Sequence, residues 1–289
     1  MKYRDRQGRT FEKTTSQDAF LAEAYGSAFG RGLMKFLSLP IFSKCLRYIL
    51  NSRLSAGFVY DFAEKNGIDM FDYEQRNFTS FNDFFTRKIK EGRRFVTGDD
   101  SVLVSPADGK VSAYEITNSN FFVIKNSVYN VDSLLRDKKL AARYMGGYAI
   151  IIRLSVDDYH RYIYPCNGVK SHDRHIEGFL HTVNPVVNRY VPVYKENSRT
   201  YCMLRSDNFG DVIQMEVGAL MVGKISNTHS GKGKIRRGEE KGCFEFGGST
   251  IVLLLEKDKA EVCGDLIRNT MEGCETIVRQ GEPLAVKKY

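Results

Sequence analysis

The chain after Gly98 is divided into many short segments of strand-forming residues, and this pattern restricts the fold more than any other feature. The segments are rich in valine, isoleucine and tyrosine, and glycine, asparagine, aspartate or proline residues separate them, as turns separate strands. Short strands joined by tight turns predict a β-rich domain over residues 99–289 with mostly antiparallel pairing. The predicted strands cover residues 102–105, 110–116, 121–125, 148–155, 160–164, 201–205, 212–217, 220–225 and 250–256, with a helix at residues 132–143.

The first 98 residues show helical spacing instead, from about Ser16 to Ile89. Within this region Ser80 is placed as the N-cap of a helix. A chain of 289 residues, 42% of them hydrophobic, is long enough to bury one large core and to carry an appendage. We therefore expect an α+β protein, in which a helical N-terminal region, residues 1–98, lies on the β-rich domain.

Residues 24–60 contain no acidic residue, although the chain as a whole carries 35 acidic and 43 basic residues and a net charge of +8. Pro40 suits a first helical turn, and an apolar stripe at helical spacing follows it, with Lys44 and Arg47 beside the stripe. The stripe consists of Phe42, Cys45, Leu46, Ile49 and Leu50. Such a helix fits an anionic membrane surface, and it also fits packing on its own domain. Lysines and arginines interrupt the chain before the ~20 apolar residues that a transmembrane span requires.

Residues 246–250, Phe-Gly-Gly-Ser-Thr, lie between a charged, glycine-rich segment and the apolar run 251–255. A hydroxyl that follows two glycines can attack the carbonyl carbon of the preceding residue, because glycine leaves that peptide unshielded. The attack would replace the Gly248–Ser249 peptide bond by an ester, and elimination and hydrolysis would then leave a pyruvoyl group. Its ketone is an electrophile that the standard side chains lack. The motif alone also fits a turn that enters a buried strand.

Two further segments supply an acid and a base in the order Asp, His, Ser: residues 105–110 (SPADGK) and residues 157–162 (DDYHRY). Together with residues 79–87, 180–185 and 217–223, they resemble the phosphatidylserine decarboxylases. The resemblance covers nearly the whole chain. Chance does not explain several long motifs in the same order.

The resemblance implies self-cleavage between Gly248 and Ser249, which gives a large chain, residues 1–248, and a small chain, residues 249–289, that stay associated. Ser249 then becomes a covalent pyruvoyl group, His160 is the base that activates its hydroxyl, and Asp108 orients that histidine. The pyruvoyl group forms a Schiff base with phosphatidylserine, which loses CO2 and leaves as phosphatidylethanolamine. No metal is implied.

The implied substrate is a phospholipid, so the resemblance places the protein peripherally at the cytoplasmic face of the cell membrane. His160 is the first candidate for the acid that protonates the α-carbon, and His181 is a distant second. A homo-oligomer stays open, because the sequence does not give the oligomeric state.

The residues alone leave other roles open at these positions. Asp108 also fits a hairpin turn, and His160 also fits a half-buried strand residue. Asp157 or Asp158 could orient the imidazole instead. Many bacterial members of the family carry a second histidine where this chain has Ile163, and a strand would turn that position away from His160. The glycine pair before Ser249 also departs from the Leu-Gly that is common in the family.

Other ligands are disfavoured by the sequence. A metal site built on Cys166, His172 and His175 lacks a fourth ligand. The six cysteines have no Cys-x-x-Cys spacing and are expected to be reduced thiols of a cytoplasmic protein.

Residues 231–242 alternate glycine with basic residues, but the acidic residues that balance their charge argue against binding of nucleic acid. We expect this segment to be a mobile loop that delivers Ser249 and meets lipid phosphates.

Two other functions also fit parts of the sequence: a pyruvoyl-dependent decarboxylase of a soluble amino acid, and a non-catalytic membrane-binding β-module. The acid-free stretch of residues 24–60 argues against the first. The non-catalytic module would stay intact, whereas either pyruvoyl-dependent decarboxylase would be cleaved. A serine hydrolase is disfavoured because the chain has no Gly-x-Ser-x-Gly motif.

Overall fold

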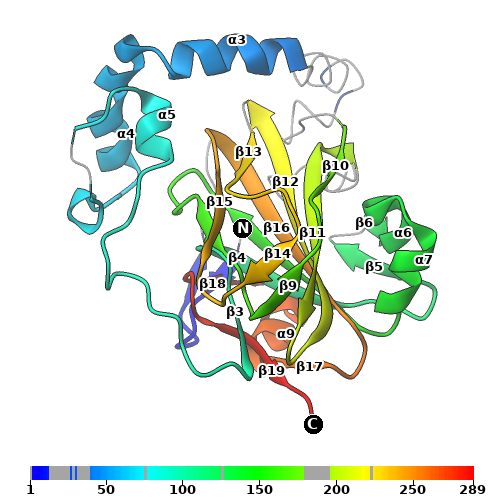
Figure 1. Ribbon diagram of the computed structural model, residues 1–289. Helices are drawn as coiled ribbons and strands as arrows, with labels where there is room; N and C mark the ends of the chain where they lie inside the picture. Colours follow the sequence, from blue (N-terminus) through cyan, green and yellow to red (C-terminus); the bar gives the residue numbers. More distant parts are fainter. Residues whose placement is uncertain are drawn as a thin grey trace.

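The computed structural model describes residues 2–12, 27, 30, 40–74, 77–124, 127–178, 196–221 and 224–289. It shows a β-rich body with a group of helices above one end of the sheets (Figure 1). The fold is therefore α+β with mostly antiparallel strands, as the sequence predicts. His181 and most of residues 24–39 lie outside the described residues.

Eleven strands form the largest sheet, in the order β14-β9-β11-β12-β16-β7-β4-β18-β1-β2, with β10 beside β11. Neighbouring strands are antiparallel, except that β1 and β18 are parallel. The strands are β1 (Lys2–Arg4), β2 (Thr10–Glu12), β4 (Gly109–Glu115), β7 (Tyr148–Leu154), β9 (Gly168–Lys170), β10 (Arg174–Ile176), β11 (Arg199–Ser206), β12 (Gly210–Met221), β14 (Gly233–Ile235), β16 (Gly247–Leu255) and β18 (Glu275–Val278).

Three smaller sheets surround the large one. The first has the order β13-β15-β8, the second β17-β19-β3, and the third is the hairpin of β5 and β6. Their strands are β3 (Val102–Val104), β5 (Phe121–Ile124), β6 (Ser127–Asn130), β8 (Arg161–Ile163), β13 (Ile225–Asn227), β15 (Glu240–Phe244), β17 (Ala260–Val262) and β19 (Pro283–Lys287). In the sheet of β13, β15 and β8, strand β8 begins at the residue after His160.

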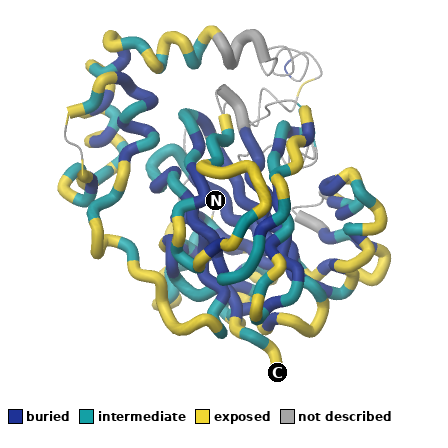
Figure 2. Tube along the Cα trace, viewed as in Figure 1, coloured by how far each residue is buried: buried dark blue, intermediate teal, exposed yellow. Residues whose placement is uncertain are grey.

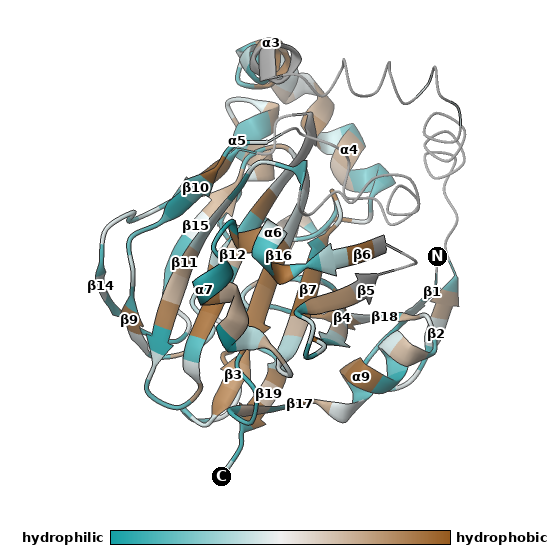
Figure 3. Ribbon diagram, turned by 90° about the vertical axis from the view of Figure 1, so that its right-hand side faces the viewer, coloured by the Kyte–Doolittle hydropathy of each residue, from teal (hydrophilic) through white to brown (hydrophobic). Residues whose placement is uncertain are grey.

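The apolar run of β16 is buried on both faces of the large sheet, which explains why it is continuous and does not alternate. Ile251, Leu253 and Leu255 belong to one core cluster, whereas Val252 and Leu254 belong to the other. Figure 2 shows the central strands as dark blue, buried chain, and Figure 3 shows hydrophobic stretches along them. The strand that holds Ser249 is thus fixed in the middle of the molecule.

The helical N-terminal region forms a third core cluster of its own, in which Phe81, Phe84 and Phe85 are buried. Ser80 caps the helix of these residues as predicted, because its side chain accepts a hydrogen bond from the backbone of Asp83. No helix among the described residues is long and apolar enough to cross a bilayer. The helices are α3 (Pro40–Leu50), η1 (Arg53–Phe58), α4 (Val59–Lys65), η2 (Met70–Asp72), α5 (Phe81–Phe85), α6 (Val131–Leu135), α7 (Lys138–Ala141), η3 (Ala142–Tyr144) and α9 (Gly264–Met271).

Two local predictions were wrong, and the single helix expected at residues 132–143 is instead divided into α6, α7 and η3, because Arg136 has a left-handed conformation with a φ of 49°. Residues 212–217 and 220–225 were expected as two strands, but β12 continues to Met221 because a bulge carries it past the glycine at position 218. Residues 231–242 were expected as a mobile loop, but β14 pairs with β9 and β15 pairs with β8 and β13.

Candidate active site

Ser249 lies near the start of β16 and is fully buried. In the sheet it stands opposite Gly218 of β12 on one side and opposite Leu154 of β7 on the other. Its side chain points to the same face as Ile251 and Leu253, since alternate strand residues share a face. The hydroxyl Oγ is 3.5 Å from the carbonyl oxygen of Gly247. The Ser249 hydroxyl is therefore held inside the protein, away from bulk water.

The backbone before Ser249 is irregular where the chain would be cut. Gly247 has a φ of 141°, a conformation that favours glycine over residues with a side chain. The register passes from the pair Gly218–Ser249 to the pair Met221–Gly247, so a bulge in β12 lies opposite Gly248. Bulges are common beside active sites, because they interrupt regular pairing. The peptide bond between Gly248 and Ser249 thus lies where the regular ladder ends.

His160 is fully buried immediately before β8. Its Nδ1 lies 2.9 Å from the backbone oxygen of Asp158, so this nitrogen donates and carries the hydrogen. The other ring nitrogen, Nε2, is buried and makes no hydrogen bond among the described residues. Burial, together with the nearby charge of Arg87, lowers the pKa of His160 to about 3. The imidazole is therefore neutral near pH 7 and has a free lone pair on Nε2.

Aromatic packing brings His160 close to the segment that precedes Ser249. The ring of Phe85 lies 4.0 Å from the imidazole and 5.0 Å from the ring of Phe246, measured between centroids. The backbone N–H of Phe244 donates to the oxygen of His160 at 3.0 Å. His160 thus contacts both the strand that leads into the cleavage segment and the phenylalanine that packs on that segment.

Asp108 has different partners from those the resemblance implies. Its carboxylate accepts hydrogen bonds from Nε of Arg94 at 2.8 Å, from the Nη2 of the same arginine, and from the backbone N–H of Gln280 at 2.8 Å. Among the described residues Asp108 and His160 share no hydrogen bond, and the carbonyl of Asp158 orients the imidazole instead. The role of Asp108 in activating His160 stays a prediction.

Asp158 contributes through its backbone, and its carboxylate binds Lys110. The lysine Nζ lies 2.8 and 2.7 Å from the two carboxylate oxygens, and the backbone N–H of Ser155 donates to one of them at 2.6 Å. Burial would lower the pKa of Lys110, but the charges of Asp158 and Asp157 raise it. The loop before His160 is therefore anchored to β4, and sequence reasoning missed this lysine because its role depends on a partner 48 positions away.

The N-terminal helices also hold the residues just before the cleavage point. Arg47 of α3 pairs with Glu245 at 3.0 Å, and Asn82 of α5 accepts a hydrogen bond from the backbone of Phe246 at 3.0 Å. Arg47 was expected beside the stripe on a membrane-facing helix, but it is engaged in this ion pair. Within that stripe Ile49 is 58% exposed, whereas Leu50 packs against the core cluster of the helices.

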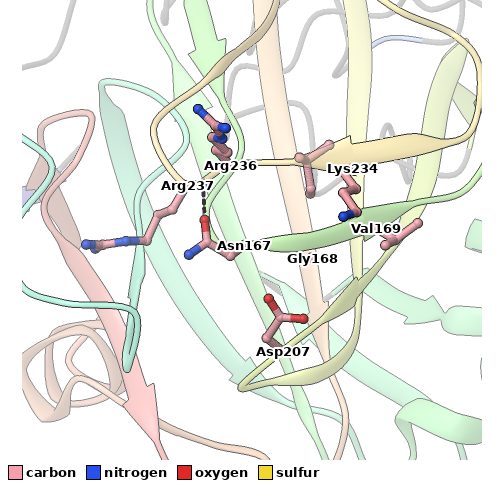
Figure 4. Close-up of a pocket in the computed structure, with 8 residues that line it drawn as sticks. Asn167, Gly168, Val169, Asp207, Lys234, Arg236 and Arg237 are labelled. Carbon is pink, nitrogen blue, oxygen red and sulfur yellow. Dashed lines mark hydrogen bonds between the residues drawn. The ribbon is translucent and has the colours of Figure 1, made fainter.

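Two hollows open in the described part of the molecule. One of about 610 Å³ opens at β9 and β14, where Asn167, Asp207, Lys234, Arg236 and Arg237 line it (Figure 4). The backbone N–H of Arg237 donates to the side chain of Asn167 there. A second hollow adjoins it along residues 228–235. None of the residues Asp108, His160, Gly248 and Ser249 lines either hollow.

The burial of His160 predicts a specific dependence of stability on pH. We expect the free energy of unfolding of an uncleavable Ser249→Ala chain to decrease as the pH falls below about 6.5, because the unfolded histidine binds a proton that the folded one rejects. The contribution approaches ~1.4 kcal/mol per pH unit and ends near pH 3, where the folded state also binds the proton. Urea unfolding at several pH values measures this slope. His160→Gln in the same background should show a shallower slope, and equal slopes would contradict a neutral buried imidazole.

Comparison with known proteins shows which family the chain belongs to. Residues 81–285 match the family described as phosphatidylserine decarboxylase. The phosphatidylserine decarboxylase proenzyme 2 of Clostridium acetobutylicum is 45% identical over 90% of this chain and 89% of its own. The phosphatidylserine decarboxylase proenzymes of Clostridium botulinum strain 657 and Clostridium novyi are 37% and 38% identical, over 100% and 93% of both chains.

The described part of the chain thus places a buried serine after a glycine pair, and a neutral histidine beside the segment that precedes it. The chain belongs to the phosphatidylserine decarboxylase family, and it is a carboxy-lyase.

Proposed function

We propose that the chain decarboxylates phosphatidylserine to phosphatidylethanolamine and CO2 with a pyruvoyl group that it makes from its own Ser249. The observation that supports this most directly is that Ser249 and His160 are both buried and that both lie beside the segment of residues 244–248. Ser249 is a nucleophile without access to bulk water, and His160 is neutral with a free Nε2. Gly247 has a φ of 141°, so the backbone just before the proposed cleavage point has a conformation that favours glycine.

The self-cleavage we propose uses only groups of this chain and water. His160 takes the proton of the Ser249 hydroxyl, whose oxygen bonds to the carbonyl carbon of Gly248 while the C–N bond between the two residues breaks. The freed amine takes a proton, and an ester joins the two pieces. Loss of the α-proton of residue 249 expels the Gly248 carboxylate, and water then replaces the nitrogen, which leaves as ammonia. The products are the large chain 1–248 and the small chain 249–289.

The two chains are expected to stay associated, because the small chain begins inside the large sheet. Its first strand, β16, lies between β12 and β7 of the large chain. Its later strands β18 and β19 pair with β4 and β3, which also belong to the large chain. Separating the chains would expose buried apolar surface on both faces of β16.

In the decarboxylation, the pyruvoyl ketone supplies an electrophile for the substrate amine and a sink for the electrons left by CO2. His160 is proposed to pass a proton, which enters from the solvent, to the α-carbon after CO2 has left. A buried histidine with a lowered pKa suits this task, because it binds the proton weakly and gives it up readily.

We further propose that the helical N-terminal region docks on the anionic cytoplasmic face of the cell membrane without crossing it. Several of its apolar side chains are exposed, among them Tyr48 at 83%, Leu54 at 89% and Phe58 at 67%. α3 lies close to β12, whose end faces the start of β16 (Figure 1). Apolar side chains at this end could enter the lipid surface and bring the headgroup toward Ser249.

The docking surface can be tested separately from cleavage. We expect Leu54→Glu/Phe58→Glu to weaken binding to vesicles of anionic phospholipid by about tenfold or more, because two apolar side chains can no longer enter the bilayer. Self-cleavage should be unchanged, and turnover of vesicle-bound substrate should fall. Flotation with vesicles measures binding, and gel electrophoresis measures cleavage.

The control is Met271→Glu, which places the same charge at a side chain that is 83% exposed on α9, on the opposite side of the molecule (Figure 1). It should bind vesicles like the parent. Arg47 is not a suitable test position, because its reversal would break the ion pair with Glu245. Equal vesicle binding by the Leu54→Glu/Phe58→Glu variant and its parent would remove the docking surface from the proposal.

A further inference from the structure

The inner face of β12 carries two polar side chains in a row where the neighbouring strand is apolar. Gln214 and Glu216 stand opposite Leu253 and Ile251 of β16, and Gly218 stands opposite Ser249. All these residues therefore point to one face of the large sheet. Gln214 and Glu216 are completely buried. Glu216 is thus the diagonal neighbour of the nucleophile, one step further along the same face.

Each of the two polar side chains reaches across the interior to the small sheet of β13, β15 and β8. The amide of Gln214 donates to the backbone oxygen of Ile163 in β8 at 3.2 Å. The carboxylate of Glu216 pairs with Lys241 of β15 at 2.6 Å, and neither side chain has any exposed surface. Lys241 also lies 3.5 Å from the Asn227 Oδ1 atom of β13. The small sheet is therefore joined to β12 by two directional contacts.

The local backbone is built to turn Lys241 inward. Glu240 pairs with Ile163 and Gly242 pairs with Tyr162, so Lys241 is the extra residue of a bulge. A bulge redirects the side chain of the residue that it adds. Gly242 is required beside it, because an added Cβ would lie 2.4 Å from the backbone oxygen of Ser226. This arrangement places a lysine in a core position that an apolar residue would ordinarily fill.

Stability does not account for such a pair. Removing two charges from water costs free energy, and replacing a buried ion pair by apolar residues of similar size is often neutral or stabilising. A hydrogen-bonded ion pair fixes the relative position of the two strands that carry it, whereas apolar packing allows several positions. The base and the nucleophile lie on different sheets, since His160 precedes β8 and Ser249 lies in β16. Their relative position must be held within a fraction of an ångström for proton transfer.

We propose that the Glu216–Lys241 pair, together with Gln214, is a positioning device that sets the small sheet, and with it His160, against the strand of Ser249. The inference rests on the proposed self-cleavage. It assigns these three residues no contact with substrate. Its consequence is that the two sheets could be packed and stable without the pair, but the hydroxyl and the imidazole would meet less often in a reactive geometry.

The test is the double variant Glu216→Met/Lys241→Met, which leaves no unpaired buried charge and keeps similar side-chain length. Full-length chains are made by cell-free synthesis, and conversion to the two fragments is followed over time on gels at several pH values. We expect cleavage about ten- to a hundredfold slower at every pH, with an unchanged pH profile. The melting temperature, measured in a Ser249→Ala background so that every chain is intact, should stay within a few degrees of the parent.

Two further variants make the result specific. Gln214→Leu removes the second contact alone and should also slow cleavage, by a smaller factor, so the inference can be tested even if the double variant does not fold. Arg6→Met/Asp265→Met removes an ion pair with hydrogen bonds of 3.0 and 2.8 Å far from the interior, and it should cleave like the parent.

Three outcomes would overturn the inference. The first is cleavage by Glu216→Met/Lys241→Met and Gln214→Leu at the parent rate. The second is a loss of rate that only follows a loss of folded protein. The third is a shifted pH profile, which would make the pair an acid or base and not a positioning device. If the parent chain itself stays intact, the proposed function fails, and that result is distinct from all three.

Discussion

Replacing Ser249 by alanine is expected to abolish both the cut and the activity. The parent chain should separate under denaturing conditions into residues 1–248 and 249–289, whereas Ser249→Ala should remain at full length and release no CO2 from phosphatidylserine. The reason is that alanine supplies neither the oxygen that attacks Gly248 nor the atoms of the ketone. Intact-mass measurement of the freshly purified protein checks the first result, and release of labelled CO2 checks the second.

The small chain gives a second readout in the same experiment. Its mass should be lower than that of the unmodified peptide by one molecule of ammonia, and a hydrazine reagent should label it at its first residue. Ser249→Cys is expected to cut slowly, because a thiol can make the same acyl shift. A parent protein that is active at full length would contradict the entire scheme.

Thr250→Val is the matched control for this substitution. Thr250 is the next residue and is also fully buried, and its hydroxyl has no hydrogen-bond partner among the described residues. Its side chain points to the opposite face of β16, since neighbouring strand residues alternate. Valine has nearly the same shape and removes a hydroxyl that makes no hydrogen bond, so little stability is lost. This variant should cut and turn over like the parent.

The sequence predicted the parts of the fold that have a local signal. The apolar run of residues 251–255 and the turn residues around the strands indicated the β-rich body, and Ser80 was recognisable as a helix cap. The hairpin of β1 and β2 was missed, because its residues are mostly polar or charged. β1 is held by parallel pairing with β18 near the other end of the chain. Pairing with a strand so far away in the chain leaves no recognisable strand pattern in the sequence of β1 itself.

For the candidate site, the sequence suggested a nucleophile and a base, which stay predictions, but it did not indicate the residues that surround them. Ser249 and His160 could be named because their motifs resemble a family, whereas the partner of Asp108 could not. Arg94, which binds that carboxylate, lies in a charged segment that looks like any solvated connection. Lys241 was read as part of a mobile basic loop, although its bulge turns it into the core. A glutamate inside the apolar strand of residues 212–217 was the one signal that could have pointed to it.

The second large effect concerns His160. We expect His160→Ala to slow self-cleavage by about a hundred- to ten-thousandfold, which is the usual contribution of a general base. The physical reason is that the Ser249 hydroxyl is too weak an acid to react without a neutral imidazole that takes its proton. A time course of cleavage after cell-free synthesis, with the Ser249→Ala chain as the zero-rate reference, measures this effect. Because burial keeps His160 neutral, the parent rate should change little between about pH 6 and pH 8.

Asp108→Ala is expected to impair cleavage less than His160→Ala, because the carbonyl of Asp158 already fixes the hydrogen on Nδ1 of the imidazole. Arg94→Met is the control that separates two roles of this aspartate. Asp108 immediately precedes β4 and binds both Arg94 and the backbone of Gln280. Through Arg94, it attaches the segment between the N-terminal helices and the sheets to the start of β4. If both variants lose the same rate, Asp108 acts through this structural link. If only Asp108→Ala is slow, the carboxylate acts on the histidine, as the family resemblance implies. Normal processing in His160→Ala would show that another base takes the proton, and Asp158, the carboxylate next but one to His160, would be the next residue to replace.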